Sequence, residues 1–248
     1  MSGPERVYAV GDVHGQLALL NAAHEAIEAD LAASPVSAHV VVHIGDFVDR
    51  GPESAGVIGL LLRGEEEGRP WINLLGNHDR MFFRYLAAPG GRDSKLRSEY
   101  WWLHERIGGA DTLRSYGLSV PEGASEARGA ALHREARLAV PALHFAFLAG
   151  LRRFWRWRGW FFAHAGVKPG VALSDQAEDD LIWIRDEFLN SRADHGAVIV
   201  HGHTPVDRVE DHGVRIAIDT GAGYGGPLAC VALEADGAAR VLGGPRLR

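Results

Sequence analysis

Five short apolar runs in this sequence each end abruptly in polar residues and glycine. The transitions read YAV-GDVHGQ, HIG-DFVDRGP, LLG-NHDR, FFA-HAG and VIV-HGHT. Short apolar runs bounded by glycine are typical of buried strands. In open α/β sheets, ligands bind beyond the carboxyl ends of the strands. A chain with this pattern is therefore expected to gather its polar side chains at one edge of a sheet.

The first third of the chain alternates strand-like and helix-like segments. Runs at 6–10, 39–45 and 70–76 have strand character, while 17–33 and 53–67 have helical length and spacing. This strand–helix–strand repetition predicts an α/β fold with crossover helices.

The sequence pattern changes after residue 80. Residues 81–155 are helix-leaning with glycine-rich interruptions, and we expect them to form a helical cap inserted into a single domain spanning 1–248. Strand patterns with short connections then return, which favours a more antiparallel second half.

Composition excludes several classes of protein. The chain has 46% hydrophobic and 23% charged residues and a net charge of −6, so we expect neither nucleic-acid nor membrane partners. No apolar run is long enough to span a bilayer, and the start leads into a strand without a leader-like segment, so we expect a cytoplasmic protein. Cys230 is the single cysteine, which excludes an intramolecular disulfide and a cysteine-based zinc cluster.

Six side chains in the strand-end clusters have the chemistry of metal ligands. Two carboxylates, one amide and three imidazoles, with no thiolate, suit manganese, iron or zinc, whereas magnesium and calcium prefer oxygen throughout. Six ligands are too many for one tetrahedral ion with an open position, but they suit two ions bridged by a carboxylate. The six are Asp12, His14, Asp46, Asn77, His164 and His203.

The motif series GDVHG, GDFVDRG, GNHD, HAG and HGHT resembles the phosphoprotein phosphatase family of binuclear metallophosphoesterases. The resemblance runs from about residue 7 to 226, and it is strongest to the bacterial serine/threonine phosphatase branch. GGADTLRSYG (108–117), LIWIRDEF (181–188) and IDTGAGYGG (218–226) support it. It implies the calcineurin-like fold, with two mixed sheets sandwiched between helices in an α-β-β-α arrangement.

The resemblance also assigns the ligands. Asp12, His14 and Asp46 would hold one ion, and Asp46 would bridge to a second. Asn77, His164 and His203 would complete the second site. The implied cofactors are two divalent ions, manganese first, with iron or zinc as alternatives. The implied reaction is in-line attack on phosphorus by a metal-bridging hydroxide, without a phosphoenzyme.

Two arginines are expected to bind the substrate phosphate, because guanidinium matches phosphate oxygens bidentately. Arg50 follows the metal-bearing loop, and Arg185 lies in WIRDEF, where the resemblance places a second phosphate arginine. The alternative for Arg185 is a surface ion pair with Asp186 or Glu187.

The resemblance makes His78 the general acid that protonates the leaving group, oriented by Asp49. Pairing with a carboxylate is expected to raise the pKa of this histidine. Asp79 and His201 differ from eukaryotic relatives and are expected to support ligands rather than react. Tyr224 could line the site or simply pack.

Three functions remain open at this point. The leading one is a serine/threonine protein phosphatase, acting on a phosphorylated protein or a small phosphoester. The second is a symmetrical diadenosine tetraphosphate or related nucleotide hydrolase, for which Tyr100, Trp101 and Trp102 could stack a base, although a helix packed on the sheet edge is the simpler interpretation. The third is a catalytically inactive scaffold that binds phosphoproteins.

Two motifs resemble nucleotide- or nucleic-acid-binding patterns, but their surroundings in the sequence do not support those functions. GAGYGG (221–226) matches a dinucleotide-binding pattern, yet a strand rather than a helix follows it. RRFWRWRGW (152–160) could bind single-stranded nucleic acid, but its alternation predicts a strand with one packed face. His43 is expected in the core rather than at the metals.

Overall fold

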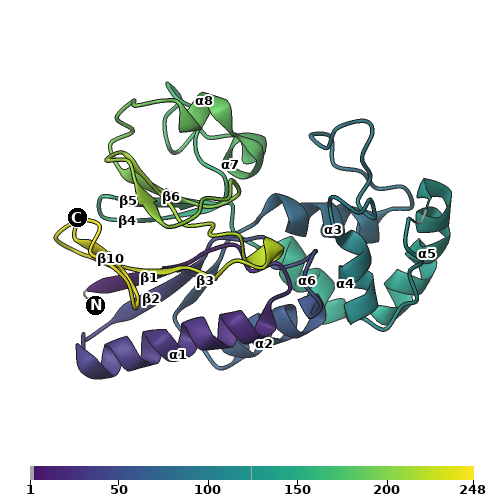
Figure 1. Cartoon of the computed structure of the whole chain (residues 1–248), viewed down its shortest axis with the longest axis horizontal. Helices are drawn as coiled ribbons and strands as arrows, with labels where there is room; N and C mark the ends of the chain where they lie inside the picture. The colour runs from purple at the N-terminus through teal and green to yellow at the C-terminus, as the bar shows by residue number, and fades with distance from the viewer. Residues whose placement is uncertain (1–2, 124) are drawn as a thin grey trace.

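The computed structural model describes residues 3–123 and 125–248 (Figure 1). Its first sheet has the strand order β10-β9-β1-β2-β3. Its strands are β1 (Arg6–Val10), β2 (His39–His43), β3 (Trp71–Asn73), β9 (Cys230–Glu234) and β10 (Ala239–Val241). The neighbours β1, β2 and β3 are parallel, joined by α1 (Leu17–Ala33) and α2 (Ser54–Glu66). The predicted strand–helix–strand repetition is confirmed, with boundaries within three residues of those expected.

The second sheet has the order β4-β5-β6-β8-β7. Its strands are β4 (Phe154–Trp157), β5 (Trp160–Ala163), β6 (Val198–His201), β7 (Glu210–Asp211) and β8 (Arg215–Ala217). The pairs β5–β6 and β6–β8 are parallel, so the expectation of a more antiparallel second half is wrong at the centre of this sheet. The reason is the long crossover through α7 (Glu178–Trp183) and α8 (Asp186–Leu189), which returns the chain to the same end before β6 begins.

Alternate residues of the strands pack into different layers. Val7 and Ala9 of β1 face the second sheet, where they pack in one cluster with Phe162. Tyr8 and Val10 point the other way, into the cluster under α1 and α2. A third cluster lies between the second sheet and α7 and α8. The period-two alternation thus builds the predicted α-β-β-α sandwich, whose layers can be followed in Figure 1.

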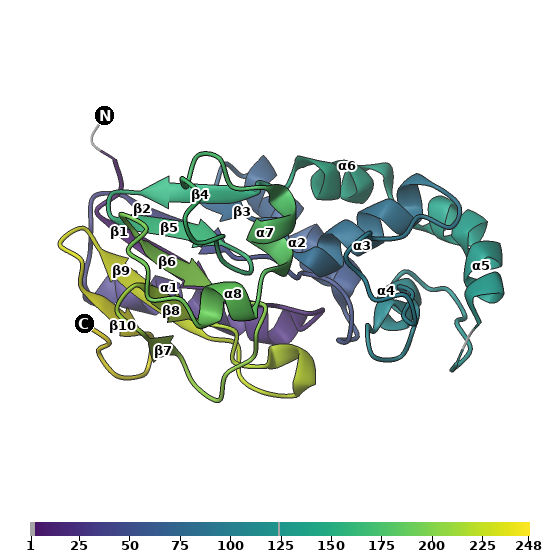
Figure 2. The same cartoon turned by 90° about the horizontal axis from the view of Figure 1, so that it is seen from above.

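Four helices lie together at one end of the molecule, away from both termini (Figure 2). They are α3 (Asn77–Ala87), α4 (Gly109–Ser115), α5 (Glu126–Ala139) and α6 (Ala142–Gly150). That 81–155 acts as an inserted cap, and that the chain is one domain, stay predictions. The described residues contain no helix with the length and apolar character needed to cross a bilayer.

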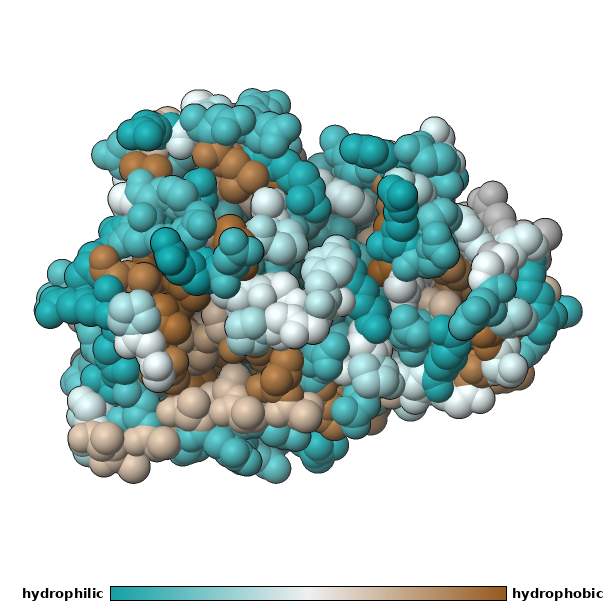
Figure 3. Space-filling model, viewed as in Figure 1, coloured by the Kyte–Doolittle hydropathy of each residue, from teal (hydrophilic) through white to brown (hydrophobic). Residues whose placement is uncertain are grey.

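The arginine–tryptophan stretch is a strand, as expected. Trp155 and Trp157 of β4 pack against the cluster between the sheets, while Arg156 is exposed. The aromatic rings are therefore used in packing. On the face drawn in Figure 3, hydrophilic residues dominate over α7 and α8, and the outline is notched between these helices and the α3–α5 end.

Candidate metal centre

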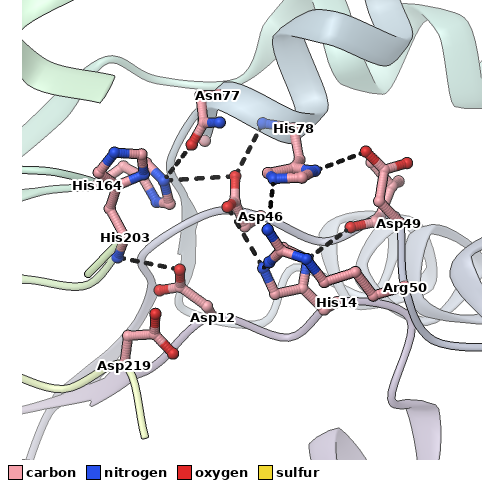
Figure 4. Close-up of polar contacts among 12 residues, drawn as sticks. Asp12, His14, Asp46, Asp49, Arg50, Asn77, His78, His164, His203 and Asp219 are labelled. Atoms are coloured by element: carbon pink, nitrogen blue, oxygen red, sulfur yellow. Dashed lines mark hydrogen bonds and ion pairs between the residues drawn. The ribbon is translucent and has the colours of Figure 1, made fainter. Parts of the chain in front are cut away.

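The predicted ligands lie together where the strands of both sheets end (Figure 4). Asp12, Asp46 and Asn77 follow β1, β2 and β3, while His164 and His203 follow β5 and β6. Parallel strands bring these ends to one edge, because the crossover helices return the chain each time to the opposite end. All six predicted ligands, including His14, are at most 6% exposed.

The carboxylate of Asp46 lies between two groups of nitrogen ligands. Its Oδ1 is 3.4 Å from His164 Nε2, and its Oδ2 is 3.5 Å from His14 Nε2. Potential metal ligands cluster as His14–Asp46–His78 and as Asp46–His164–His203, so Asp46 belongs to both groups. One carboxylate with an oxygen directed at each group is what a bridging ligand requires.

Two of the histidines are fixed in the tautomer that a metal needs. His14 Nδ1 donates to the carbonyl of Val48 at 2.9 Å, and His164 Nδ1 donates to that of Ile44 at 3.0 Å. A carbonyl only accepts, so each Nε2 presents its lone pair to the centre. His164 Nε2 faces Asn77 Oδ1 at 2.9 Å, which brings two acceptors together. Burial lowers the pKa of His164 to about 3, so this ring is neutral.

Two buried ligand atoms have no hydrogen-bond partner among the described residues, Asp12 Oδ1 and His203 Nε2. The backbone N–H of His203 donates to Asp12 Oδ2 at 3.0 Å, which holds the two loops together. Leaving a buried acceptor without a partner is costly, and a cation would satisfy both atoms. The residues present therefore fit a divalent metal ion.

The buried carboxylates repel one another. Burial, and then the charges of Asp219 and Asp46, raise the pKa of Asp12 well above its ordinary value. Burial raises the pKa of Asp46 to about 7. Such a cluster favours a bound cation, which would offset the cost of ionising these groups.

Asp219 was not predicted as part of the centre, yet it lies beside Asp12 (Figure 4). It follows β8 in the run VRIAI-D, the same apolar-to-polar transition that marked the other five clusters. Its Oδ1 accepts the backbone N–H of Gly221 at 2.9 Å. The strand-end pattern could have identified it.

Asp79 holds the turns that carry the ligands. Its carboxylate accepts the backbone N–H groups of Gly76, Asp46 and Phe47 at 2.8–2.9 Å. Burial raises the pKa of Asp79 to about 8. Asp46 has a left-handed backbone with φ of 52°, so these bonds stabilise a conformation that is unfavourable for a non-glycine residue.

His78 and Asp49 form a buried pair at the edge of the centre. His78 Nδ1 lies 2.6 Å from Asp49 Oδ2, and its Nε2 accepts from Arg50 at 3.0 Å. Burial, followed by the charges of Arg50 and His14, lowers the pKa of His78 well below its ordinary value. The expectation that Asp49 raises this pKa is therefore wrong for the chain alone, because desolvation and the neighbouring cation outweigh the carboxylate.

The two predicted phosphate arginines flank the centre. Arg50 contacts His14 Nε2 and places its guanidinium 4.6 Å from the ring centroid of the exposed Tyr224. Arg185 is exposed and donates to Thr204 Oγ1 at 3.3 Å. The described residues show no ion pair of Arg185 with the neighbouring acids. Burial lowers the pKa of His203 well below its ordinary value, and the charge of Arg185 contributes further in the same direction.

The structure also places His201, His43 and the GAGYGG stretch. His201 Nδ1 donates to the carbonyl of Gly202 at 3.1 Å, and its ring packs on Phe188 rather than facing the ligands. His43 is fully buried in the core, as expected. The 3₁₀ turn Ala222–Tyr224 leads to β9, and no helix follows the GAGYGG stretch.

The expectation that Tyr100–Trp102 lie in a helix packed on the sheet edge is wrong. These residues lie in irregular turns before α4. The buried ring of Trp102 instead reaches Asp49, to which its indole N–H donates at 3.0 Å.

Comparison with known proteins agrees with this geometry. Residues 5–244 match the calcineurin-like phosphoesterase family. The chain is 35% identical over 232 residues to serine/threonine-protein phosphatase 2 of Escherichia coli, covering 90% of each chain. It is 28% identical over 237 residues to serine/threonine-protein phosphatase 1 of Salmonella typhimurium, covering 92% of each.

Solved structures show the same fold at lower identity. A crystal structure described as a proposed diadenosine tetraphosphatase has a TM-score of 0.63 at 20% identity, covering 98% of this chain and 94% of that one. The cold-active protein-tyrosine phosphatase of a psychrophilic Shewanella has a TM-score of 0.62 at 18% identity, with coverage of 98% and 80%.

Proposed function

The chain belongs to the calcineurin-like phosphoesterase family, and on that basis we propose that it is a two-metal phosphomonoester hydrolase acting as a serine/threonine protein phosphatase. The observation that carries the proposal is the position of Asp46, whose two oxygens face separate groups of histidines. The two bacterial relatives named as serine/threonine phosphatases support the substrate class, since each matches along most of its length.

The ligands divide around Asp46. Asp12 and His14 would complete one site, while the other would draw on three residues from further along the chain. These are Asn77, His164 and His203. When bound, two divalent ions, manganese in our proposal, would polarise the phosphoryl group and activate a water molecule for in-line attack on phosphorus.

Arg50 and Arg185 would bind the phosphate oxygens that the metals leave free. Arg50 rests against His14 and His78 in the chain alone, so a phosphate dianion would offer its guanidinium a stronger, bidentate partner. Its movement toward phosphate would also free His78 Nε2.

His78 would then donate its Nε2 proton to the departing alkoxide, as Asp49 holds the Nδ1 proton. A dianionic phosphate beside the ring would raise the pKa of His78, which burial and Arg50 otherwise lower. His78 would thus be protonated when the substrate binds and neutral after it has donated its Nε2 proton.

A substrate panel with manganese tests the proposal. Phosphoserine and phosphothreonine peptides, p-nitrophenyl phosphate and diadenosine tetraphosphate are compared at equal enzyme concentration. We expect the phosphopeptides to have a higher kcat/KM than the dinucleotide. Preference for the dinucleotide would instead identify a nucleotide hydrolase. Bound metal with no turnover of any of these would identify a catalytically inactive scaffold.

A further inference from the structure

The carboxylate of Asp49 is fully buried, and side-chain donors reach both of its oxygens. Oδ2 faces His78 Nδ1 at 2.6 Å and accepts the Trp102 indole N–H at 3.0 Å. Oδ1 accepts the Thr112 hydroxyl at 2.7 Å and a longer contact from the same indole at 3.2 Å. A carboxylate held at both oxygens cannot rotate, so its direction toward His78 is fixed.

The Thr112 hydroxyl makes two hydrogen bonds to Asp49. Its oxygen accepts the backbone N–H of Asp49 at 2.8 Å, and its proton is donated to Asp49 Oδ1 at 2.7 Å. The hydroxyl therefore holds both the backbone and the side chain of one residue. Ser54 Oγ lies 3.2 Å from the same hydroxyl and from the Asp49 amide nitrogen, closing the network from α2.

The loop that carries Asp49 needs this support. Asp49 and Arg50 both have left-handed backbones, with φ of 72° and 67°. Such conformations are unfavourable for non-glycine residues and persist where contacts enforce them. The Arg50 amide donates to the carbonyl of Gly108 at 3.2 Å, so residues 102–112 brace the backbone of both.

Trp102 is itself held rigidly. Its ring stacks on Phe82 of α3 at a centroid distance of 5.0 Å and lies 4.5 Å from the ring of Tyr85. These contacts explain why an aromatic ring is present at Trp102, since the ring packs in the core. They do not account for an indole N–H directed at a buried carboxylate, which phenylalanine could not provide.

We propose that Trp102 and Thr112 are positioning residues for the general acid, fixing Asp49 so that the Nε2 proton of His78 faces the leaving oxygen. This inference rests on the proposed function, since it assumes that His78 protonates the leaving group. Trp102 and Thr112, which lie between β3 and β4, thereby support leaving-group protonation through Asp49 and His78.

The test compares leaving groups that need protonation with one that does not. Trp102→Phe keeps the ring and removes only the N–H. We expect kcat/KM for a phosphoserine peptide to fall roughly tenfold or more, as for loss of a hydrogen bond to a charged group, with less than about a twofold change for p-nitrophenyl phosphate. The matched control is Trp101→Phe, which removes an indole N–H that does not bond to Asp49 and should leave both rates unchanged.

A second variant pair removes dependence on how well Trp102→Phe folds. Thr112→Val should show the same selective loss for the peptide, and Thr112→Ser, which keeps the hydroxyl, should restore it. If Trp102→Phe unfolds, the Thr112 pair decides the question alone. Equal losses on the two substrates, or no loss on either, would overturn the positioning role.

A double-mutant cycle separates this inference from the proposed function. In a His78→Asn background, Trp102→Phe should have no further effect on the peptide, because it acts through His78. A full additional loss would overturn the inference while leaving the phosphatase proposal intact. If the wild-type protein hydrolysed neither substrate, the proposed function itself would fail.

Discussion

Asp46 contacts three other residues of the centre through its carboxylate. Its two oxygens face His164 and His14, and Oδ1 also accepts the backbone N–H of His78 at 3.0 Å. Burial disfavours the ionised form of this carboxylate and raises its pKa to about 7. A carboxylate buried in this way is expected to bind a cation.

Asp46→Asn should lower phosphatase activity by more than roughly 100-fold and reduce metal content. The reason is that the amide of asparagine lacks the negative charge with which Asp46 would bridge two dications. Activity on p-nitrophenyl phosphate and metal content by mass spectrometry check this. Full activity with full metal content would rule out the bridging role.

Arg185→Ala should raise the inhibition constant for inorganic phosphate roughly tenfold, since it removes a charge-assisted hydrogen bond. Arg192→Ala, which removes an exposed arginine after α8, is the matched control and should not change phosphate inhibition. An inhibition constant for Arg185→Ala equal to that of the control would place Arg185 outside the phosphate site.

At the scale of elements, the turns after the strands could be predicted from sequence because strand period and glycine placement are local properties. The expected 17–33 and 6–10 coincide with α1 and β1. All six predicted ligands converge, since neighbouring parallel strands end at one edge.

Other features depend on contacts distant in sequence and could not be predicted. The parallel pairing of β5 with β6 follows from where a long crossover returns the chain. Trp102 reaches Asp49 from 53 positions away, and no pattern in the intervening turns indicates that contact. The pKa of His78 is lowered by burial and then by the charge of Arg50, and neither cause could be predicted from the pairing with Asp49.

Gly202 lies in the turn between β6 and His203. A Cβ on Gly202 would lie 1.9 Å from Asp12 Oδ1, so Gly202→Ala should displace that ligand and reduce metal binding and activity. Gly159→Ala is the control, because a Cβ in the β4–β5 turn meets nothing within 4 Å. Both variants are assayed for manganese affinity by calorimetry. Equal affinities would show that the close approach is unimportant.

At the scale of the whole molecule, the buried carboxylates link stability to pH and metal. Burial raises the pKa of Asp46 to about 7 and that of Asp79 to about 8. Unfolded aspartates have a pKa of about 3.9 and unfolded histidines of about 6.5. Between about pH 7 and 8 the folded chain therefore holds more protons than the unfolded one, and its stability falls as pH rises.

The metal-free protein should accordingly unfold at a lower temperature at pH 8 than at pH 7. The expected loss is up to about 1.4 kcal/mol per pH unit for each proton retained. Manganese should reverse it, because a cation that binds only the folded state stabilises that state. Thermal unfolding in chelator and in manganese, at both pH values, checks this. A Tm that rises from pH 7 to 8 in chelator would contradict the prediction.

We propose that this chain holds two divalent ions that share Asp46. An anomalous difference map from crystals of the full chain grown with manganese would locate both ions. We expect two peaks flanking the Asp46 carboxylate, one next to Asp12 and His14 and the other next to Asn77, His164 and His203. A single peak, or manganese bound away from Asp46, would contradict the two-metal centre.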